Sequence, residues 1–265
     1  MKVFSNYFLT FVVFLQRFKN KTVENKPQIS LVLDFGNSFI KTGVFRGDEL
    51  IHKSKDITMD QLPDYINKIQ PEKIMISSVS IDEVDIMKKI GNSYKVHFLN
   101  SNTELPIQLN YTTVNTLGSD RIAGAAGAYK LWPGQNTMVL DAGTCLTYDF
   151  IDKDGIYQGG AISPGINMKF KALHTYTASL PLLEKAEEIT LTGKSTEESI
   201  LSGVIIGTCA EITEIIRMYQ NKLPDLQLAI CGGDAIYLSK RLHIGHIVEP
   251  DLVLIGLKYI LDNNA

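Results

Sequence analysis

Two short stretches of the chain, 107 positions apart, share a pattern of residues that can hold phosphate groups. They are Asp34-x-Gly36-Asn37-Ser38 and Asp141-x-Gly143-Thr144. In each, an aliphatic run predicts a buried strand, and the glycine permits a tight turn into a second strand. Backbone N–H groups and short polar side chains at such turns bind phosphate oxygens, and the two carboxylates could hold a cation against them. The repeated pattern predicts a nucleotide site between two similar halves.

A single Asp-x-Gly stretch is more typical of an ordinary hairpin turn than of a binding site. The repetition favours the site, because each copy follows an aliphatic strand and precedes further strands. Lys41 lies three positions after Ser38, where its ammonium group could reach the phosphates. The alternative is a strand lysine that faces solvent, which is common for this residue type.

A second group of residues could act on the other substrate. Asp120 and Arg121 follow Gly118 at the start of an Ala- and Gly-rich helix that is predicted to end near Leu131. A carboxylate near the positive end of the helix dipole stays ionised and could accept a proton from a hydroxyl group, although a plain helix cap is the alternative. The guanidinium could bind a carboxylate bidentately, and Tyr111 could add a hydrogen bond. The substrate implied is a small anion that carries an alcohol.

Composition limits the classes of partner. The chain has 265 residues with 45% apolar residues, enough to bury the cores of two domains. A net charge of -3 gives no general attraction to nucleic acid or to an anionic membrane. Three scattered cysteines and five histidines indicate neither a disulfide framework nor a zinc site. We expect a cytoplasmic protein without nucleic acid and without stable membrane insertion.

The predicted elements follow the same order, βββαβαβα, in both halves. We therefore expect an α/β fold made of two duplicated domains with mixed sheets, residues 29–134 and 135–265, around a nucleotide cleft. In the second half, the third strand is expected at Ile156–Gln158, ending at Gly159 and Gly160, with a helix that opens at Ser163–Gly165. Residues 1–28 carry an apolar run, too short to span a bilayer, followed by basic residues. We interpret them as a dispensable N-terminal extension; the alternative is a peripheral membrane anchor.

Four motifs in this order resemble those of the bacterial type III pantothenate kinases, a family of the actin, sugar kinase and Hsp70 superfamily. They are Asp34-x-Gly-Asn-Ser-x-x-Lys41, Gly118-Ser-Asp-Arg121, Asp141-x-Gly-Thr144 and Gly159-Gly-Ala-Ile-Ser-Pro-Gly165. The resemblance runs from about Ile29 to the C-terminus. It implies two actin-like, ribonuclease H-like domains. It also implies ATP-dependent phosphorylation of the primary hydroxyl of pantothenate to 4'-phosphopantothenate, the first step of coenzyme A biosynthesis.

The resemblance also implies roles for individual residues. Asp120 is the catalytic proton acceptor, and Asp141 binds a monovalent cation, K⁺ or NH₄⁺. The residues implied in pantothenate binding are Tyr111, Gly118, Ser119, Asp120, Arg121 and Thr196. Those implied in ATP binding are Asp34, Phe35, Gly36, Asn37, Ser38, Phe39, Ile40, Lys41 and Thr144. Mg²⁺ is expected to accompany ATP, and a homodimer is expected. Ser38 stands where the family has Thr, Ser119 where Ala is common, and Cys145 where a small residue is usual.

Two alternatives from other functional classes remain at this point. The same family resembles a group of accessory factors named for transcriptional activation, so a non-catalytic relative is one alternative. A nucleotide or polyphosphate hydrolase of the same superfamily is the other. Retention of Asp34, Asp120, Arg121 and Asp141 favours the kinase, and Arg121 suits an anionic acceptor better than water.

Overall fold

The computed structural model of the chain describes residues 28–37 and 39–264, which form two mixed sheets. Ser38 and the N-terminal extension lie outside the described residues, apart from Gln28. The first sheet contains β1 (Ile29–Phe35), β2 (Ile40–Arg46), β3 (Glu49–Ile57), β4 (Lys73–Ser78) and β5 (Lys95–Phe98). The second contains β6 (Gln108–Leu109), β7 (Thr137–Ala142), β8 (Cys145–Ile151), β9 (Ile156–Pro164), β10 (Gln227–Cys231) and β11 (Ile247–Val248).

The two sheets have equivalent topologies. The first has the order β3-β2-β1-β4-β5, and the second has β9-β8-β7-β10-β11 with β6 added beyond β9. In both, the second strand is antiparallel to the first and to the third, and the later strands run parallel to the first. The two halves therefore share one fold, an α/β fold with mixed sheets, as the repeated sequence pattern predicts.

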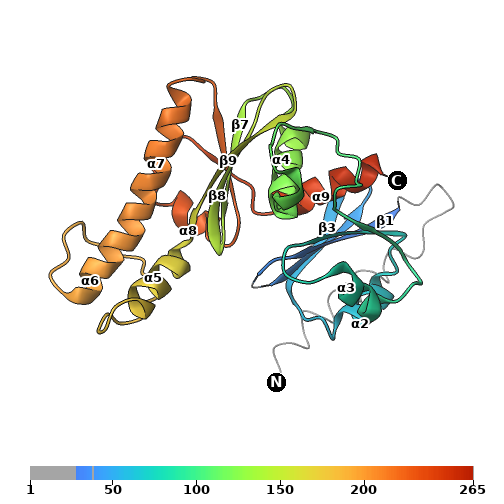
Figure 1. Cartoon of the computed structure of the whole chain (residues 1–265), viewed down its shortest axis with the longest axis horizontal. Helices are drawn as coiled ribbons and strands as arrows, with labels where there is room; N and C mark the ends of the chain where they lie inside the picture. Colours follow the sequence, from blue (N-terminus) through green and yellow to red (C-terminus); the bar gives the residue numbers. More distant parts are fainter. Residues whose placement is uncertain (1–27, 38, 265) are drawn as a thin grey trace.

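Helices cover the outer faces of both sheets, and two helices lie between the sheets (Figure 1). The first outer face is covered by α2 (Leu62–Ile69) and α3 (Glu83–Ile90), and a 3₁₀ turn, Val114–Thr116, follows later. The second outer face is covered by α5 (Ile166–Thr175), α6 (Thr196–Leu201), a π-helical segment (Ser202–Ile206), α7 (Gly207–Gln220) and α8 (Ala235–Ser239). The helices between the sheets are α4 (Ser119–Leu131) and α9 (Leu252–Asn263).

Strand alternation decides which side chains face the two inner helices. Leu31, Leu33 and Phe35 of β1 pack under α2 and α3, so Val32 and Asp34 point to the opposite face. On β7, Met138, Leu140 and Ala142 pack under the outer helices of the second half, so Val139 and Asp141 point inward. Both aspartates of the repeated motif thus face the space between the sheets.

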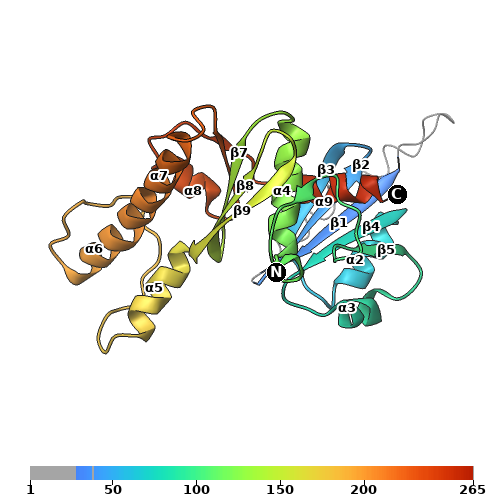
Figure 2. The ribbon, with the colours of Figure 1, turned by 45° about the horizontal axis from the view of Figure 1, so that its top comes forward.

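Each inner helix packs on the sheet of the other half of the chain. Helix α4 follows the first sheet in sequence but packs on β7 and β8, whereas α9 ends the chain and packs on β1 and β4 (Figure 2). Their own contact is close because Gly127 and Gly256 lie where a side chain would collide with backbone atoms of the other helix. The small residues of the Ala- and Gly-rich helix α4 thus permit its close packing against α9. The boundaries of the two domains stay a prediction.

The prediction that the third strand of the second half ends at Gly159 and Gly160 is wrong. Strand β9 continues through both glycines to Pro164, and α5 begins only at Ile166. Gly160 permits the strand to pass directly over the Tyr148 carbonyl, where a Cβ would collide. Gly159 adopts a positive φ of 92° beside a shift in register, so these glycines shape a bulge instead of a strand end.

We predict that Gly127→Ala and Gly124→Ala affect stability in opposite ways. A Cβ at Gly127 would collide with the Leu252 carbonyl of α9, so we expect the free energy of unfolding to fall by about 2 kcal/mol or more. A Cβ at Gly124 would lie 3.6 Å from Val139, an ordinary contact. That variant should be neutral or gain up to about 1 kcal/mol from its better helix propensity. Urea unfolding measures both, and equal stabilities would contradict the close contact.

Candidate active site

The carboxylate of Asp34 lies at the inner face of the first sheet with one lysine and two hydroxyl groups around it. Lys41, directly opposite on β2, brings its Nζ within 4.0 Å of Asp34 Oδ2. Ser77 on β4 donates to Asp34 Oδ1 over 3.3 Å, and its hydroxyl is 2.8 Å from that of Ser119 at the start of α4. The hairpin of the first half is therefore connected to the Gly118–Arg121 segment.

Three carboxylates of the predicted site share this region. The pKa of Asp34 is raised from 3.8 to about 6, chiefly by burial; Lys41 lowers it, and the charges of Asp120 and Asp141 raise it. Burial likewise raises the pKa of Asp141. Burial alone would lower the pKa of Lys41, but the nearby carboxylates, Asp141 foremost, outweigh it and raise that pKa. The lysine is thus held as a cation among acids from both halves.

Glycines let the backbone approach Asp141 closely. Gly232, after β10, has a positive φ of 88°, and a side chain there would collide with Asp141 Oδ1 and the Ala142 carbonyl. Gly165 fits against the carbonyls of Gly143 and Thr144 and donates its N–H to the latter over 3.1 Å. The Ser163–Gly165 motif therefore buttresses the turn of the second hairpin.

The N–H groups of both motif glycines are used within their own turns. Gly36 donates to the Phe39 carbonyl over 3.2 Å, and Gly143 donates to the Cys145 carbonyl over 2.9 Å. These two donors hold the turns in shape. Phosphate contacts of the described residues would therefore fall on neighbours such as Asn37 and Thr144, both of which are exposed.

Asp120 and Arg121 lie at the first turn of α4, with Gly118 as the N-terminal cap. The Arg121 N–H donates to Asp120 Oδ1 over 2.9 Å, and that oxygen lies where a side chain on Gly118 would be. Both features fix the carboxylate next to the Asp34 and Asp141 charges. This explains why a glycine precedes the acid by two positions.

The Arg121 side chain contacts a partner that was not among the predicted site residues. It is buried, and its Nε donates to Asp149 Oδ1 over 2.8 Å on β8. Burial lowers the pKa of Arg121, but its interactions with Asp149, and also with Tyr157 and Tyr111, outweigh this and raise it. The available signal was an Asp in an apolar strand, at a position that alternates to the same face as Asp141.

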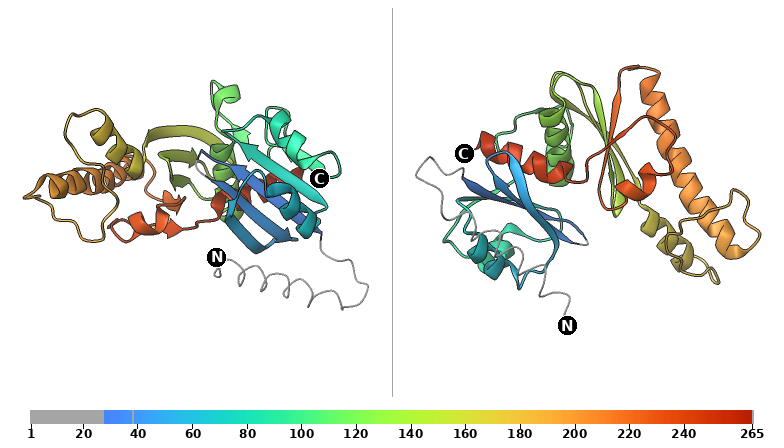
Figure 3. Two further views of the ribbon diagram at one scale, coloured as in Figure 1. Left: turned by 90° about the horizontal axis from the view of Figure 1, so that it is seen from below. Right: turned by 180° about the vertical axis from the view of Figure 1, so that it is seen from behind.

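Other predicted residues lie apart from the acidic cluster. Thr196 begins α6, which is far from α4 and the first sheet in Figure 1 and in both views of Figure 3. It lines a hollow of about 730 Å³ together with Leu173, Leu180 and Ser199. Phe39 is 59% exposed at the tip of the first hairpin, Ile40 is partly buried, and Phe35 is buried in the outer core. Phe35 can therefore border a nucleotide only through its backbone.

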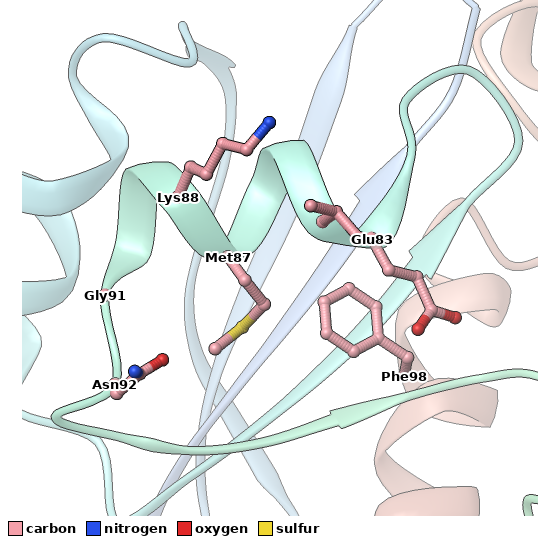
Figure 4. Close-up of a pocket in the computed structure, with 7 residues that line it drawn as sticks. Glu83, Met87, Lys88, Gly91, Asn92 and Phe98 are labelled. Carbon is pink, nitrogen blue, oxygen red and sulfur yellow. The ribbon is translucent and has the colours of Figure 1, made fainter.

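A second hollow, of about 570 Å³, lies beside α3 on the outer side of the first sheet. Figure 4 shows Met87, Lys88 and Phe98 around it, with Glu83 at one end. It contains none of the predicted site residues. Within residues 28–37 and 39–264, no three His, Cys, Asp or Glu side chains are grouped closely enough to hold a metal ion by themselves.

Known proteins match this chain over most of its length. The sequence model described as type III pantothenate kinase matches residues 30–218. The chain belongs to this family. The type III pantothenate kinase of Cytophaga hutchinsonii is 44% identical over 240 residues, which cover 89% of this chain and 100% of that protein. That of Christiangramia forsetii is 41% identical, with 89% of this chain and 99% of the relative covered.

Solved structures support the fold of this pantothenate kinase family member. A Campylobacter jejuni protein, described as belonging to the Baf family of transcriptional activators, has a TM-score of 0.59 at 23% identity; 88% of this chain and 98% of that chain are covered. A candidate 2-dehydro-3-deoxygalactonokinase from Sinorhizobium meliloti has a TM-score of 0.57 at 12% identity, with coverage of 89% and 99%. At these identities, the likeness shows the shared two-domain, actin-like fold and nothing of the activity.

We predict that Asp34→Asn stabilises the protein at alkaline pH. Because the folded state raises this pKa above its unfolded value of 3.8, folding favours the protonated acid, and stability is lost as pH rises from about 4 to 6. Removing the charge should add up to about 3 kcal/mol to the free energy of unfolding at pH 8 and almost nothing at pH 4. Urea unfolding at the two pH values measures this gain.

Asp60→Asn is the control for this prediction. The hydrogen bond from Lys89 lowers the pKa of the exposed Asp60, so that its contribution is present at pH 8 and is lost as pH falls. The control should therefore change stability slightly in the opposite direction. An Asp34→Asn protein less stable than the wild type at pH 8 would contradict the raised pKa of Asp34.

Proposed function

We propose that this protein transfers the terminal phosphoryl group of ATP to the primary hydroxyl of pantothenate, giving 4'-phosphopantothenate, the first step of coenzyme A biosynthesis. Family membership supports the reaction. The observation that carries the assignment of the site is the shared charge environment of Asp34, Asp120 and Asp141, which come from three segments far apart in sequence. Phosphoryl transfer chiefly requires positioned phosphates, neutralised charge and a base beside the attacking hydroxyl.

Asp120 is the proposed general base. The Arg121 N–H fixes one of its oxygens, so the carboxylate is oriented by the backbone before substrate binds. It lies in the first turn of α4, close to the positive end of the helix dipole. In this role the Asp120 carboxylate accepts the proton of the pantothenate hydroxyl as the oxygen attacks phosphorus.

ATP is proposed to lie along the two hairpin turns, from Asp34 to Lys41 on one side and at Thr144 on the other. The ammonium group of Lys41, already held among carboxylates, would then meet the phosphates. Asp34, Asp120 and Asp141 outnumber this lysine, so a triphosphate needs added cations. Mg²⁺ suits this arrangement, because it is often held by one or two carboxylates together with substrate phosphates.

Asp141 is the proposed ligand of a monovalent cation, K⁺ or NH₄⁺. Its Oδ1 and the Ala142 carbonyl both border the space that a Cβ on Gly232 would fill, so two oxygens converge where the backbone is bare. Carboxylate and carbonyl oxygens are the donor types that hard cations prefer. Such a cation would supply positive charge beside the phosphates of ATP.

Pantothenate is proposed to contact Tyr111 and the segment from Gly118 to Arg121, with a contribution from Thr196. Because Thr196 lies far from Asp120 within one chain, its contribution requires a second copy, and we propose a homodimer. In the described part of the chain, the helix Thr196–Gln220 is the one helix long and apolar enough to cross a membrane, and 33% of its most apolar stretch is buried in the fold. A second copy could cover the remainder.

We propose a cytoplasmic protein without nucleic acid partners and without stable membrane insertion.

We predict that Asp120→Asn lowers turnover at least ~100-fold, the scale of lost general base catalysis. The amide oxygen can still accept the Arg121 N–H, so the fold and the melting temperature should change little. The measurement is ADP release that depends on pantothenate, with Mg²⁺ and K⁺ present. Near-normal turnover would remove Asp120 from the mechanism.

The same assay separates the other functional classes. A protein that loses ATP at the same rate with and without pantothenate would be a hydrolase. No turnover at all, by a folded wild-type protein supplied with both cations, would favour the accessory factor. Either result would overturn the proposed function.

A further inference from the structure

A buried network of three elements surrounds the Arg121 guanidinium. Asp149 on β8 is 1% exposed, and its Oδ1 accepts from Arg121 Nε over 2.8 Å and from the Tyr157 hydroxyl over 2.7 Å. The Thr147 hydroxyl donates to Asp149 Oδ2 over 2.9 Å. The Tyr157 ring lies 5.9 Å from that of Tyr111, centre to centre. Residues of the second half thus fix the orientation of an arginine on α4.

One nitrogen of the Arg121 guanidinium, Nη2, lacks a well-aligned hydrogen-bond acceptor. Nη2 lies 2.7 Å from Asp149 Oδ1, but it makes no hydrogen bond of good geometry with a described residue, although the nearby Tyr111 hydroxyl also interacts with this guanidinium and raises its pKa. The two acceptor sites of Oδ1 are already taken by Arg121 Nε and the Tyr157 hydroxyl. A buried N–H group without an acceptor costs free energy. An oxygen of a bound ligand would satisfy it.

The buried ion pair of Arg121 and Asp149 is also informative. Asp149 neutralises the guanidinium, and burial of a paired charge is rarely a net gain over apolar packing. A purely structural role therefore explains poorly why the pair lies beside Asp120 and Tyr111. A planar donor held in one orientation, by contrast, suits recognition of a planar carboxylate.

We propose that Asp149 and Tyr157 are positioning residues for pantothenate: they orient Arg121 so that its Nη2 donates to the carboxylate of the bound substrate. This inference rests on the proposed function and adds to it two residues of the second half that do not touch the substrate. Arg121 makes one N–H contact through Nη2, instead of the two-pronged contact expected from the sequence. The binding of ATP does not depend on this network.

Tyr157→Phe tests the proposal with the least disturbance, because both charges of the pair remain. We expect KM for pantothenate to rise about fivefold to tenfold, the effect of losing about one orienting hydrogen bond, while kcat and KM for ATP stay within about twofold. Asp149→Asn should raise KM for pantothenate at least about tenfold. If Asp149→Asn does not fold, Tyr157→Phe decides the question.

Tyr148→Phe is the matched control. Tyr148 is as buried as Tyr157 and also donates to a carboxylate, Glu211, over 3.1 Å, but on the outer face of β8. Both variants lose one buried hydroxyl, so thermal unfolding should show similar losses of stability. KM for pantothenate should change only in Tyr157→Phe.

Two outcomes would overturn the inference in different ways. An active wild type in which both tyrosine variants leave KM for pantothenate unchanged would refute the positioning role and leave the proposed function intact. The same holds if both variants change kcat and the two KM values alike, as a merely structural role requires. A folded wild type without turnover that depends on pantothenate would refute the proposed function and the inference with it.

Discussion

Electrostatic crowding around one lysine is the constraint on which the site depends. Asp34, Asp120 and Asp141 reach the same region from β1, α4 and β7, and Lys41 is the cation among them. Burying carboxylates costs free energy, as the raised pKa of Asp34 shows. The apolar packing of the two sheets against the helices that cover them must offset that cost. The proposed site is therefore a region whose buried acids reduce the stability of the fold.

The position of this region follows from strand alternation and from one helix contact. Alternation turns Asp34 and Asp141 toward the inner helices, and the approach of Gly127 to Gly256 sets how closely these helices pack. Helix α4 also carries Asp120 and Arg121. The distance between the helices thus affects all three acids at once, although no glycine of this contact lies in the site.

Local and repeated features were predictable from the sequence. The two hairpins, the shared order of elements and the start of α4 near Asp120 follow from periodicity, glycine positions and internal repetition. The exchange of sheets by α4 and α9 was not, because a run of small residues shows that packing is close without showing the partner. Gly159 and Gly160 were misread because glycine ends many strands, whereas here it permits a crossing over Tyr148.

The candidate site was predictable only in part, because some of its residues belong to local motifs and others come together only in the fold. Asp34, Asp120 and Asp141 each belong to a short motif, so spacing alone identified them. Asp149 belongs to no motif, and its pairing with Arg121 across 28 positions is a tertiary contact. Thr196 carries the opposite lesson: the family resemblance implies a role for it, but the fold places it at the start of α6, apart from Asp120.

The exchange of inner helices bears on how the chain folds as it is made. The sheet of the first half is synthesised early, but the helix that covers its inner face, α9, is synthesised only after the strands of the second sheet. Val32, Phe45 and Met75 of that face stay bare until then. Domains usually fold one after another from the N-terminus. Here the first sheet waits for α9, so a product truncated before α9 exposes an apolar surface that chaperones and proteases can recognise.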